Sequence, residues 1–395
     1  MNDRTHKVIL FLLATAFFLC ACAERIAAQE ITSPQEGRVS VKLERGDSIA
    51  VDNRTTGRIT VIGWDKDTVE ATATSERGTE AVRVSLKETP VMKFILLKAD
   101  YLKRAEDEKP RPEPTPVTPT SSDPLELPPL PKVPAGQVHM PGVARDEGPS
   151  DPPMRDGRAI EVHLEVHVPR YVQLNLIRVI RSPVLVTNVE TPIIILGEKS
   201  DIVLKNVRDA EVRTRSGGVE IEDAAGFVEV ITASGAVRVR RAQANVRVLS
   251  INSDIEMECV RGRVNVDSAD GSITLRNIQG DVEVNVSNSN VLFAGAIRED
   301  GRYHLKTMSG SIEMAVRDKP PGFTVALSSY RGSIENDFQL QTKPSGEQRQ
   351  EDDINRRIVG RYGNGQAQIT LDSFDGRIKL VKLPPGAVKE CNAQN

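Results

Sequence analysis

Residues 219–248 read VEIEDAAGFVEVITASGAVRVRRAQANVRV and repeat a nine-residue unit. Each unit begins with a valine, at Val219, Val228, Val237 and Val246, and a second apolar residue follows two positions later. Apolar side chains at i and i+2 lie on the same face of a β-strand. The series continues without a gap through Ile255, Val264, Ile273, Val282 and Val291. The pattern therefore predicts a succession of short strands, each with one buried face.

The segments between these strands predict turns of two alternating kinds. One kind is polar and rich in serine, as at Ser216 and Ser234. The other kind has an apolar residue two positions before a small one, as at Ala224 and Ala242. Because the two kinds alternate, the structural period is two units, and a stack of such two-strand coils is a β-solenoid. We predict an all-β protein, a β-solenoid with about 18 residues per rung and irregular β caps at both ends.

Charged residues at the outward positions support this period. Four of them alternate in sign at intervals of two units, namely Glu222, Arg240, Glu258 and Arg276, and so do Glu220, Arg238 and Glu256. Equivalent residues of stacked rungs lie about 4.8 Å apart, so alternating signs avoid like charges side by side. We interpret these residues as solvated charge ladders, and a charged binding face is the functional alternative.

Composition divides the rest of the chain. We predict a signal peptide over 1–28, an N-terminal β segment over 31–86 and a disordered proline-rich insertion over 87–157. Solenoid repeats follow over 158–316, irregular β rungs or a cap over 317–386, and a frayed tail over 387–395. Within the insertion, Phe94, Leu97 and Tyr101 have helical spacing, which predicts a short helix over 89–104.

The N-terminus predicts export. Arg4 and Lys7 precede an apolar run that is too short to span a bilayer, and small residues follow it. Ordinary signal peptidase sites and a lipoprotein-like sequence ending at Cys22 compete. Cleavage before Cys22 would make this residue the lipidated N-terminus. With either cleavage, we expect the exported protein in the periplasm, at the outer membrane or at the cell surface.

Only Cys259 and Cys391 lie beyond the predicted signal peptide, which excludes a disulfide framework. Cys259 extends the apolar alternation of Ile255 and Met257, so we interpret it as a small buried hydrophobic residue and Cys391 as a free thiol.

The overall charge argues against two classes of partner. The chain has 395 residues, with 52 Lys and Arg against 55 Asp and Glu, and a formal net charge of −3. A nucleic-acid partner bound through its phosphates requires a basic surface, and so does a polybasic attachment to anionic lipid. We therefore expect neither.

Several short motifs resemble a known family. These are residues 57–61, GRITV, followed by Gly63, Trp64 and Asp65, then residues 166–169, VHVP, and the repeated serine turns at Ser216, Ser234 and Ser309. In this order they are similar to the bacterial "putative adhesin" β-strand-repeat family, a domain of unknown function related to head domains of the GIN type. The resemblance spans roughly 35–86 and 158–382. It implies an exported solenoid-like fold and adhesion or envelope scaffolding, and it carries over no catalytic residue.

Three constellations could carry chemistry, and we interpret each as structural. His163, Glu165 and His167 share one strand face, but residues four apart on a strand are separated by about 13 Å, too far to bind one metal ion. Asp267 and Asp270 could act as paired carboxylates of a polysaccharide-acting β-helix enzyme, but aspartate is also common in turns. Calcium-binding β-rolls need a glycine-rich turn that the scattered Asp254, Asp270 and Asp281 lack.

The sequence therefore predicts an exported, non-enzymatic β-solenoid with no cofactor, no metal site and no catalytic residue. Its expected role is a cell-envelope scaffold or adhesin that binds an envelope or extracellular protein or glycan. A periplasmic structural or sensory module is the alternative, followed by a β-helix enzyme.

Overall fold

The computed structural model describes residues 29–31, 37–53, 55–75, 82–88, 94–101, 154–155, 158–159, 161–317, 319–341, 356–363, 365–384, 386–388 and 391. The predicted signal peptide, Cys22 and most of the proline-rich insertion lie outside these ranges. No helix among the described residues has the length and apolarity needed to cross a membrane.

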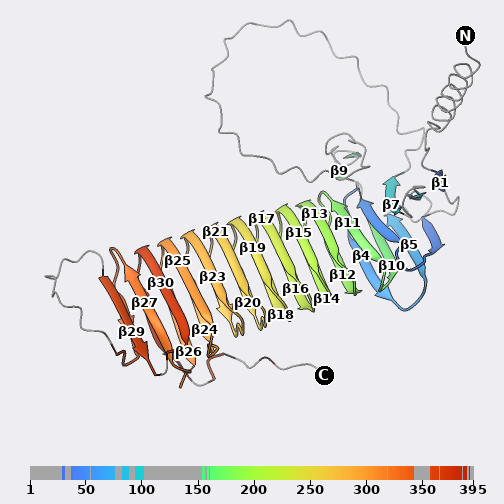
Figure 1. Cartoon of the computed structure of the whole chain (residues 1–395). Helices are drawn as coiled ribbons and strands as arrows, with labels where there is room; N and C mark the ends of the chain where they lie inside the picture. Colours follow the sequence, from blue (N-terminus) through green and yellow to red (C-terminus); the bar gives the residue numbers. More distant parts are fainter. Residues whose placement is uncertain are drawn as a thin grey trace, which may run out of the picture. The chain divides into compact units, whose positions relative to one another are not determined.

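Two long sheets form the solenoid (Figure 1). Sheet A contains, in spatial order, β1 (Gln29–Ile31), β6 (Val82–Glu88), β7 (Phe94–Tyr101), β3 (Ser48–Asn53), β11 (Gln173–Val179), β13 (Ile193–Lys199), β15 (Ala210–Ser216), β17 (Val228–Ser234), β19 (Val246–Asn252), β21 (Val264–Asp270), β23 (Val282–Asn288), β25 (Arg302–Ser309), β30 (Ala367–Asp375), β27 (Phe323–Ser329) and β29 (Arg356–Tyr362).

Sheet B contains β2 (Arg38–Lys42), β5 (Thr68–Ser75), β10 (Val162–Pro169), β4 (Ile59–Trp64), β12 (Val184–Val189), β14 (Ile202–Val207), β16 (Val219–Ala224), β18 (Val237–Ala242), β20 (Ile255–Glu258), β22 (Ile273–Arg276), β24 (Val291–Gly295), β26 (Ile312–Arg317), β31 (Ile378–Leu383) and β28 (Ile334–Asn336). A separate pair joins β8 (Met154–Arg155) to β9 (Arg158–Ala159).

The register confirms the predicted eighteen-residue rung. Val228 of β17 pairs with Val246 of β19 in sheet A, and Val219 of β16 pairs with Val237 of β18 in sheet B, all in parallel. The predicted apolar residues point between the sheets and are almost wholly buried, as Ile221 and Val230 are at 0% exposure. Each rung buries only a few side chains, so stacking supplies the burial that one rung lacks.

The serine-rich turns join each sheet A strand to the next sheet B strand and are closely packed. Gly217 and Gly235 have φ angles of +113° and +115°, which favour glycine. A Cβ atom on Gly235 would lie 2.2 Å from the carbonyl oxygen of Gly217 in the preceding rung. Inward hydroxyls bind carbonyl oxygens of the same turns, as Thr232 Oγ1 donates to the Ser234 carbonyl at 3.0 Å. Glycine is therefore required where backbones of successive rungs meet.

The other corner is formed by residues with left-handed backbone at the ends of the sheet B strands. Asn188, Asn206, Asp223, Arg241, Cys259 and Asn277 have φ angles between +51° and +60°. Asparagine and aspartate adopt this conformation most readily after glycine. The conformation places two successive side chains outward and returns the next residue to the core, as Glu222 and Asp223 precede the buried Ala224. This column was not predicted from the sequence.

The prediction for the two cysteines was wrong. Cys259 and Cys391 form a disulfide across a sequence separation of 132 residues. Cys259 lies at a left-handed corner and is half-buried, so it does not continue the inward alternation of Ile255 and Met257. Val388 packs against Ala294, Ala315 and Leu383, which holds this part of the tail against sheet B. The described part of the C-terminal tail is therefore tied to the solenoid.

The predicted helix over 89–104 was also wrong. Residues Phe94–Tyr101 form β7, which pairs in parallel with β3 and antiparallel with β6. The run from Phe94 to Leu97 is continuously apolar, and such a run fits a strand paired on both sides as well as a helix.

Both ends of the stack depart from sequence order. At the C-terminal end, β30 lies between β25 and β27 (Figure 1). In the other sheet, β31 lies between β26 and β28. The rung formed by β30 and β31, the last in the sequence, is thus inserted between the β25–β26 rung and the β27–β28 rung. At the other end, β10 lies between β5 and β4, although both precede it in the chain.

Candidate functional site

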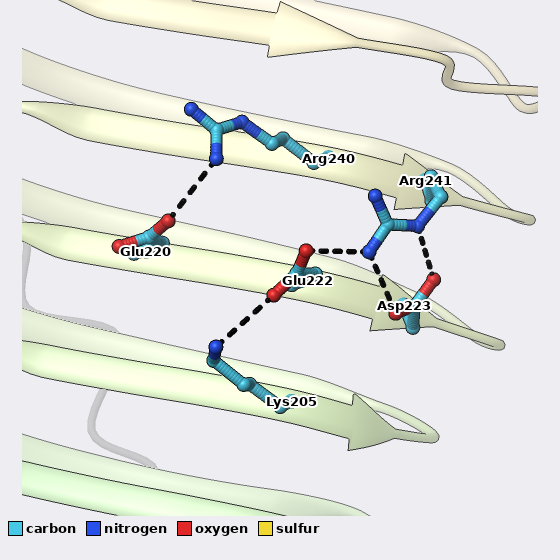
Figure 2. A network of polar contacts seen from close by, with 6 residues as sticks. All are labelled: Lys205, Glu220, Glu222, Asp223, Arg240 and Arg241. Carbon is cyan, nitrogen blue, oxygen red and sulfur yellow. Dashed lines mark hydrogen bonds and ion pairs between the residues drawn. The ribbon is translucent and has the colours of Figure 1, made fainter. Parts of the chain in front are cut away.

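The outer face of sheet B has the predicted charge ladders. Glu220 stacks on Arg238, and Glu222 stacks on Arg240, as their spacing indicates. Some contacts are diagonal, as Arg240 reaches Glu220 at 3.4 Å (Figure 2). Arg276 likewise reaches Glu256 at 2.6 Å, whereas Arg238 contacts its direct partner Glu256 at 3.7 Å. The pairs are partly exposed, so each contributes little to stability.

Arg241 is the centre of this network and was missed in the sequence. It lies at a left-handed corner and binds Asp223 and Glu222 of the preceding rung, while Lys205 binds Glu222 from the rung before (Figure 2). The hydrogen bonds that Arg241 and Lys205 donate to Glu222 lower the pKa of Glu222, and the hydrogen bonds that Arg241 donates to Asp223 and Glu222 raise the pKa of Arg241. These acidic and basic side chains pair with one another, which fits a charge ladder that fixes the register of successive rungs.

A polar groove of about 470 Å³ lies on the outer face of sheet B near its N-terminal end. Arg58, directly before β4, and the strands β4, β5 and β10 line it; the strand residues are Thr60, Thr72, Thr74, His163, Leu164 and Glu165. Glu165 lies between Thr60 of β4 and Thr72 of β5, and His163 lies beside Thr74. The groove therefore combines hydroxyl, carboxylate, imidazole and guanidinium groups on a rigid sheet.

Aromatic rings continue the same row of β10. His167 stacks on Trp64 with ring centroids 4.8 Å apart, and the Lys66 ammonium lies 4.1 Å from the centre of the Trp64 ring. The Trp64 indole N–H donates to the Thr68 carbonyl at 2.7 Å, which fixes the ring. His163, Glu165 and His167 thus form one outward row, with the polar groove at one end and the fixed tryptophan at the other.

The geometry of the row does not bring its histidines together. The backbone N–H of Arg58 donates to Nδ1 of His163 at 3.0 Å, and His167 Nε2 lies 3.6 Å from Glu165. Among the described residues, no three His, Cys, Asp or Glu side chains gather in a way that could hold a metal ion. Each histidine therefore has a different neighbour.

Asp267 and Asp270 also have separate partners. Asn285 of the next rung donates to Asp267 at 3.3 Å, and Asn288 donates to Asp270 at 3.1 Å. Asp267 lies within β21 rather than in a turn, which corrects that part of the interpretation. Both carboxylates accept hydrogen bonds that link one rung to the next.

The outer face of sheet A has an unpredicted apolar feature. Of the seven large hydrophobic residues exposed in the described part of the chain, Ile251, Met308, Phe374 and Tyr330 share one position, directly before the turn into sheet B. We call the part of this row beyond Arg215 the edge column, and its members in spatial order are Ala233, Ile251, Ala269, Ser287, Met308, Phe374 and Tyr330. Phe374 and Tyr330 stack with ring centroids 4.8 Å apart.

The fold defines a class of protein, the two-sheet β-solenoid with a filled apolar core. Residues 154–381 match the family of domains of unknown function described as Toastrack DUF4097. This match covers more than half of the chain, and the protein belongs to the Toastrack family. The expected repeat family is thereby supported, while the relation to head domains of the GIN type stays a prediction.

The other comparisons add little. A crystal structure described as a "putative cell adhesion protein" from Clostridium sporogenes aligns over 88% of this chain and 99% of that chain, with 8% identity and a TM-score of 0.19. That TM-score is too low to carry an argument. No curated protein matches the chain.

Proposed function

We propose that this protein is an exported, non-enzymatic binding module of the cell envelope that holds a glycan in the polar groove of sheet B. The observation that carries the proposal is the composition of that groove. Thr60, Thr72 and Thr74 offer hydroxyls that both donate and accept, Glu165 accepts and Arg58 donates. A sugar presents the complementary mixture of hydroxyl donors and acceptors.

The adjoining rings support the same ligand class. Pockets for small ligands combine apolar surface with a few placed polar groups, and Trp64 lies at the other end of the row that lines the groove. Strands β4, β5 and β10 hold these groups on a sheet rather than on a loop, so binding requires little ordering of the protein.

The disulfide supports export. Disulfides persist in oxidising compartments such as the periplasm and the cell surface. The Cys259–Cys391 bond fits the secretory signal predicted over 1–28.

We expect the chain to be retained on at least one polysaccharide of the bacterial envelope. The substitutions Glu165→Gln and Thr72→Ala together should weaken this binding about tenfold or more, because polar groups of the sugar would lose their partners. Glu229→Gln, on the outer face of sheet A, is the matched control and should bind normally. Equal retention of both variants, or no retention of any envelope polysaccharide, would refute the proposal.

We also expect an external protease to cleave the protein on intact cells, and the mass of its mature N-terminus to show a lipid on Cys22. These two results would place it at the surface. An unlipidated chain that the outer envelope protects would instead identify a periplasmic structural or sensory module.

A further inference from the structure

We propose that the outer face of sheet A, at its C-terminal end, binds an acidic polysaccharide at a site separate from the polar groove of sheet B. The site has four exposed cations, two on β25 (Arg302 and Lys306) and two on β29 (Arg357 and Arg361). Strands β30 and β27 lie between β25 and β29 (Figure 1). We call the outward surface that these four cations enclose the basic face.

The four cations differ from the outward arginines of β15 and β19 because they lack an acidic partner. The arginines of β15 and β19 each contact a glutamate, in the pairs Arg213–Glu211, Arg215–Glu198 and Arg247–Glu229, at 2.6, 3.9 and 3.4 Å. None of the described carboxylates forms an ion pair with a cation of the basic face. Four positive charges on this surface are therefore without a direct counter-charge.

The carboxylates nearby are fewer than the cations. Within the basic face, Asp372 lies beside Lys306 in the register and 3.6 Å from Nε2 of His304. On the bordering strand β23, Glu283 lies beside His304 in the register. Asp281, directly before β23, pairs with an arginine of the preceding rung at 3.5 Å. The basic face therefore keeps an excess of positive charge.

Protection of the sheet edge explains only half of this pattern. Strand β29 is the last strand of sheet A, and charged side chains on an edge strand prevent pairing with other chains. Arg357 and Arg361 serve that purpose. Arg302 and Lys306 do not, because β25 is paired with β23 on one side and with β30 on the other. A role that all four cations share is the attraction of an anionic partner.

The spacing of the four cations requires an extended partner. The two cations of each strand are four residues apart, about 13 Å, and β25 and β29 are three strand spacings apart, about 14 Å. A single small anion cannot contact all four. A polymer with repeated anionic groups can do so, and arginine binds a carboxylate through two parallel hydrogen bonds.

The surface between the cations suits sugar rings. Thr324, Ser328, Thr370 and Gln368 point outward there and present hydroxyl and amide groups, which pair with sugar hydroxyls. No phenylalanine, tyrosine or tryptophan among the described residues points outward between the cations, and the bases of single-stranded nucleic acid stack on such rings. An acidic polysaccharide therefore fits the basic face better than a nucleic acid does.

The test measures binding of polygalacturonate, a polymer of uronic acid, to the purified full chain at low ionic strength. The full chain is used because Glu351, Asp352 and Asp353 precede β29 outside the described residues. Arg302→Gln/Arg361→Gln should weaken binding about tenfold or more, because two of the four contacts to carboxylates are lost. The control Arg213→Gln/Arg215→Gln removes the same charge from the same sheet face and should bind normally.

Two further comparisons identify the ligand and the site. Carboxyl-reduced polygalacturonate, which is neutral, should not bind, and added salt should weaken binding of the acidic polymer by screening. The groove variant Glu165→Gln/Thr72→Ala should bind polygalacturonate normally, so failure of this proposal and failure of the proposed function are distinguishable.

Three results would overturn the proposal: no binding of polygalacturonate, equal weakening by both pairs of arginine substitutions, or equal binding of the neutral polymer. Vesicles that contain phosphatidylglycerol supply a fourth. If they bind as tightly as polygalacturonate and the same variant loses this binding, the basic face recognises a membrane surface instead. All four substituted arginines are exposed, so circular dichroism should show an unchanged fold.

Discussion

Loss of the Cys259–Cys391 disulfide is expected to lower the melting temperature by about 10 °C or more. The bond closes a loop of 132 residues, and chain entropy alone predicts a loss of about 5 kcal/mol for a loop of this length. It also holds the tail against Ala294 and Ala315, so the C-terminal rungs should open first. Thermal unfolding of Cys259→Ser/Cys391→Ser, followed by circular dichroism, measures the effect.

Reductant supplies the control for this experiment. The unsubstituted chain should melt in reductant as the double variant does, and the double variant should not respond to reductant at all. Equal melting of the oxidised and the reduced chain would show that the disulfide contributes nothing to stability.

A buried charge in the inserted rung is expected to detach the C-terminal end of the stack. Leu371 of β30 is fully buried, and Leu371→Asp would place an unpaired carboxylate in the core at a cost of about 4 kcal/mol or more. Strands β27, β28 and β29 join the rest of the sheets through β30 and β31, so they should lose their amide protection, with exchange about a thousandfold faster.

Hydrogen exchange with mass spectrometry would show how far along the solenoid amide protection is lost. Each rung contacts mainly its neighbours, so strands such as β15 and β17 should keep their protection. Thr370→Asp adds the same charge to the outward face of the same strand and should exchange like the unsubstituted chain. Uniform loss of protection along the whole solenoid would contradict this view of the inserted rung.

The repeat predicted the rungs because burial sets the period of the sequence. The nine-residue valine series fixed which side chains face inward, and the alternating turn types fixed the two-strand rung. The charge ladders followed from the same period. The inward residues, the turn types and the charge ladders depend on local sequence, and the same pattern recurs in every rung.

The order of the terminal rungs could not be read from the sequence, because strands β27 and β30 present similar apolar alternation and either could stack on β25. The disulfide was missed for a related reason. Cys259 lies at a left-handed corner, and the apolar pattern does not reveal such corners. Cys391 is 132 residues away in the sequence, so no local pattern indicates that the two cysteines meet.

The edge column left a signal that could have been used. Ala233, Ile251 and Met308 each precede a turn residue by two positions, as do Phe374 and Tyr330. An apolar residue two positions before the turn residue points outward, and its recurrence in successive rungs indicates an exposed apolar row. The polar groove had no comparable signal, since it depends on β10 entering between β4 and β5.

The inserted rung constrains how the protein is made. Strands β27 and β28 are synthesised before β30 and β31, yet they occupy the more distant position in the stack. A chain that emerges from the ribosome or from an export channel therefore cannot add its last rungs to the stack in the order of their synthesis. Strands β27 and β28 can pair with β30 and β31 only after residue 383 has been synthesised, and the disulfide at Cys391 can form only after that.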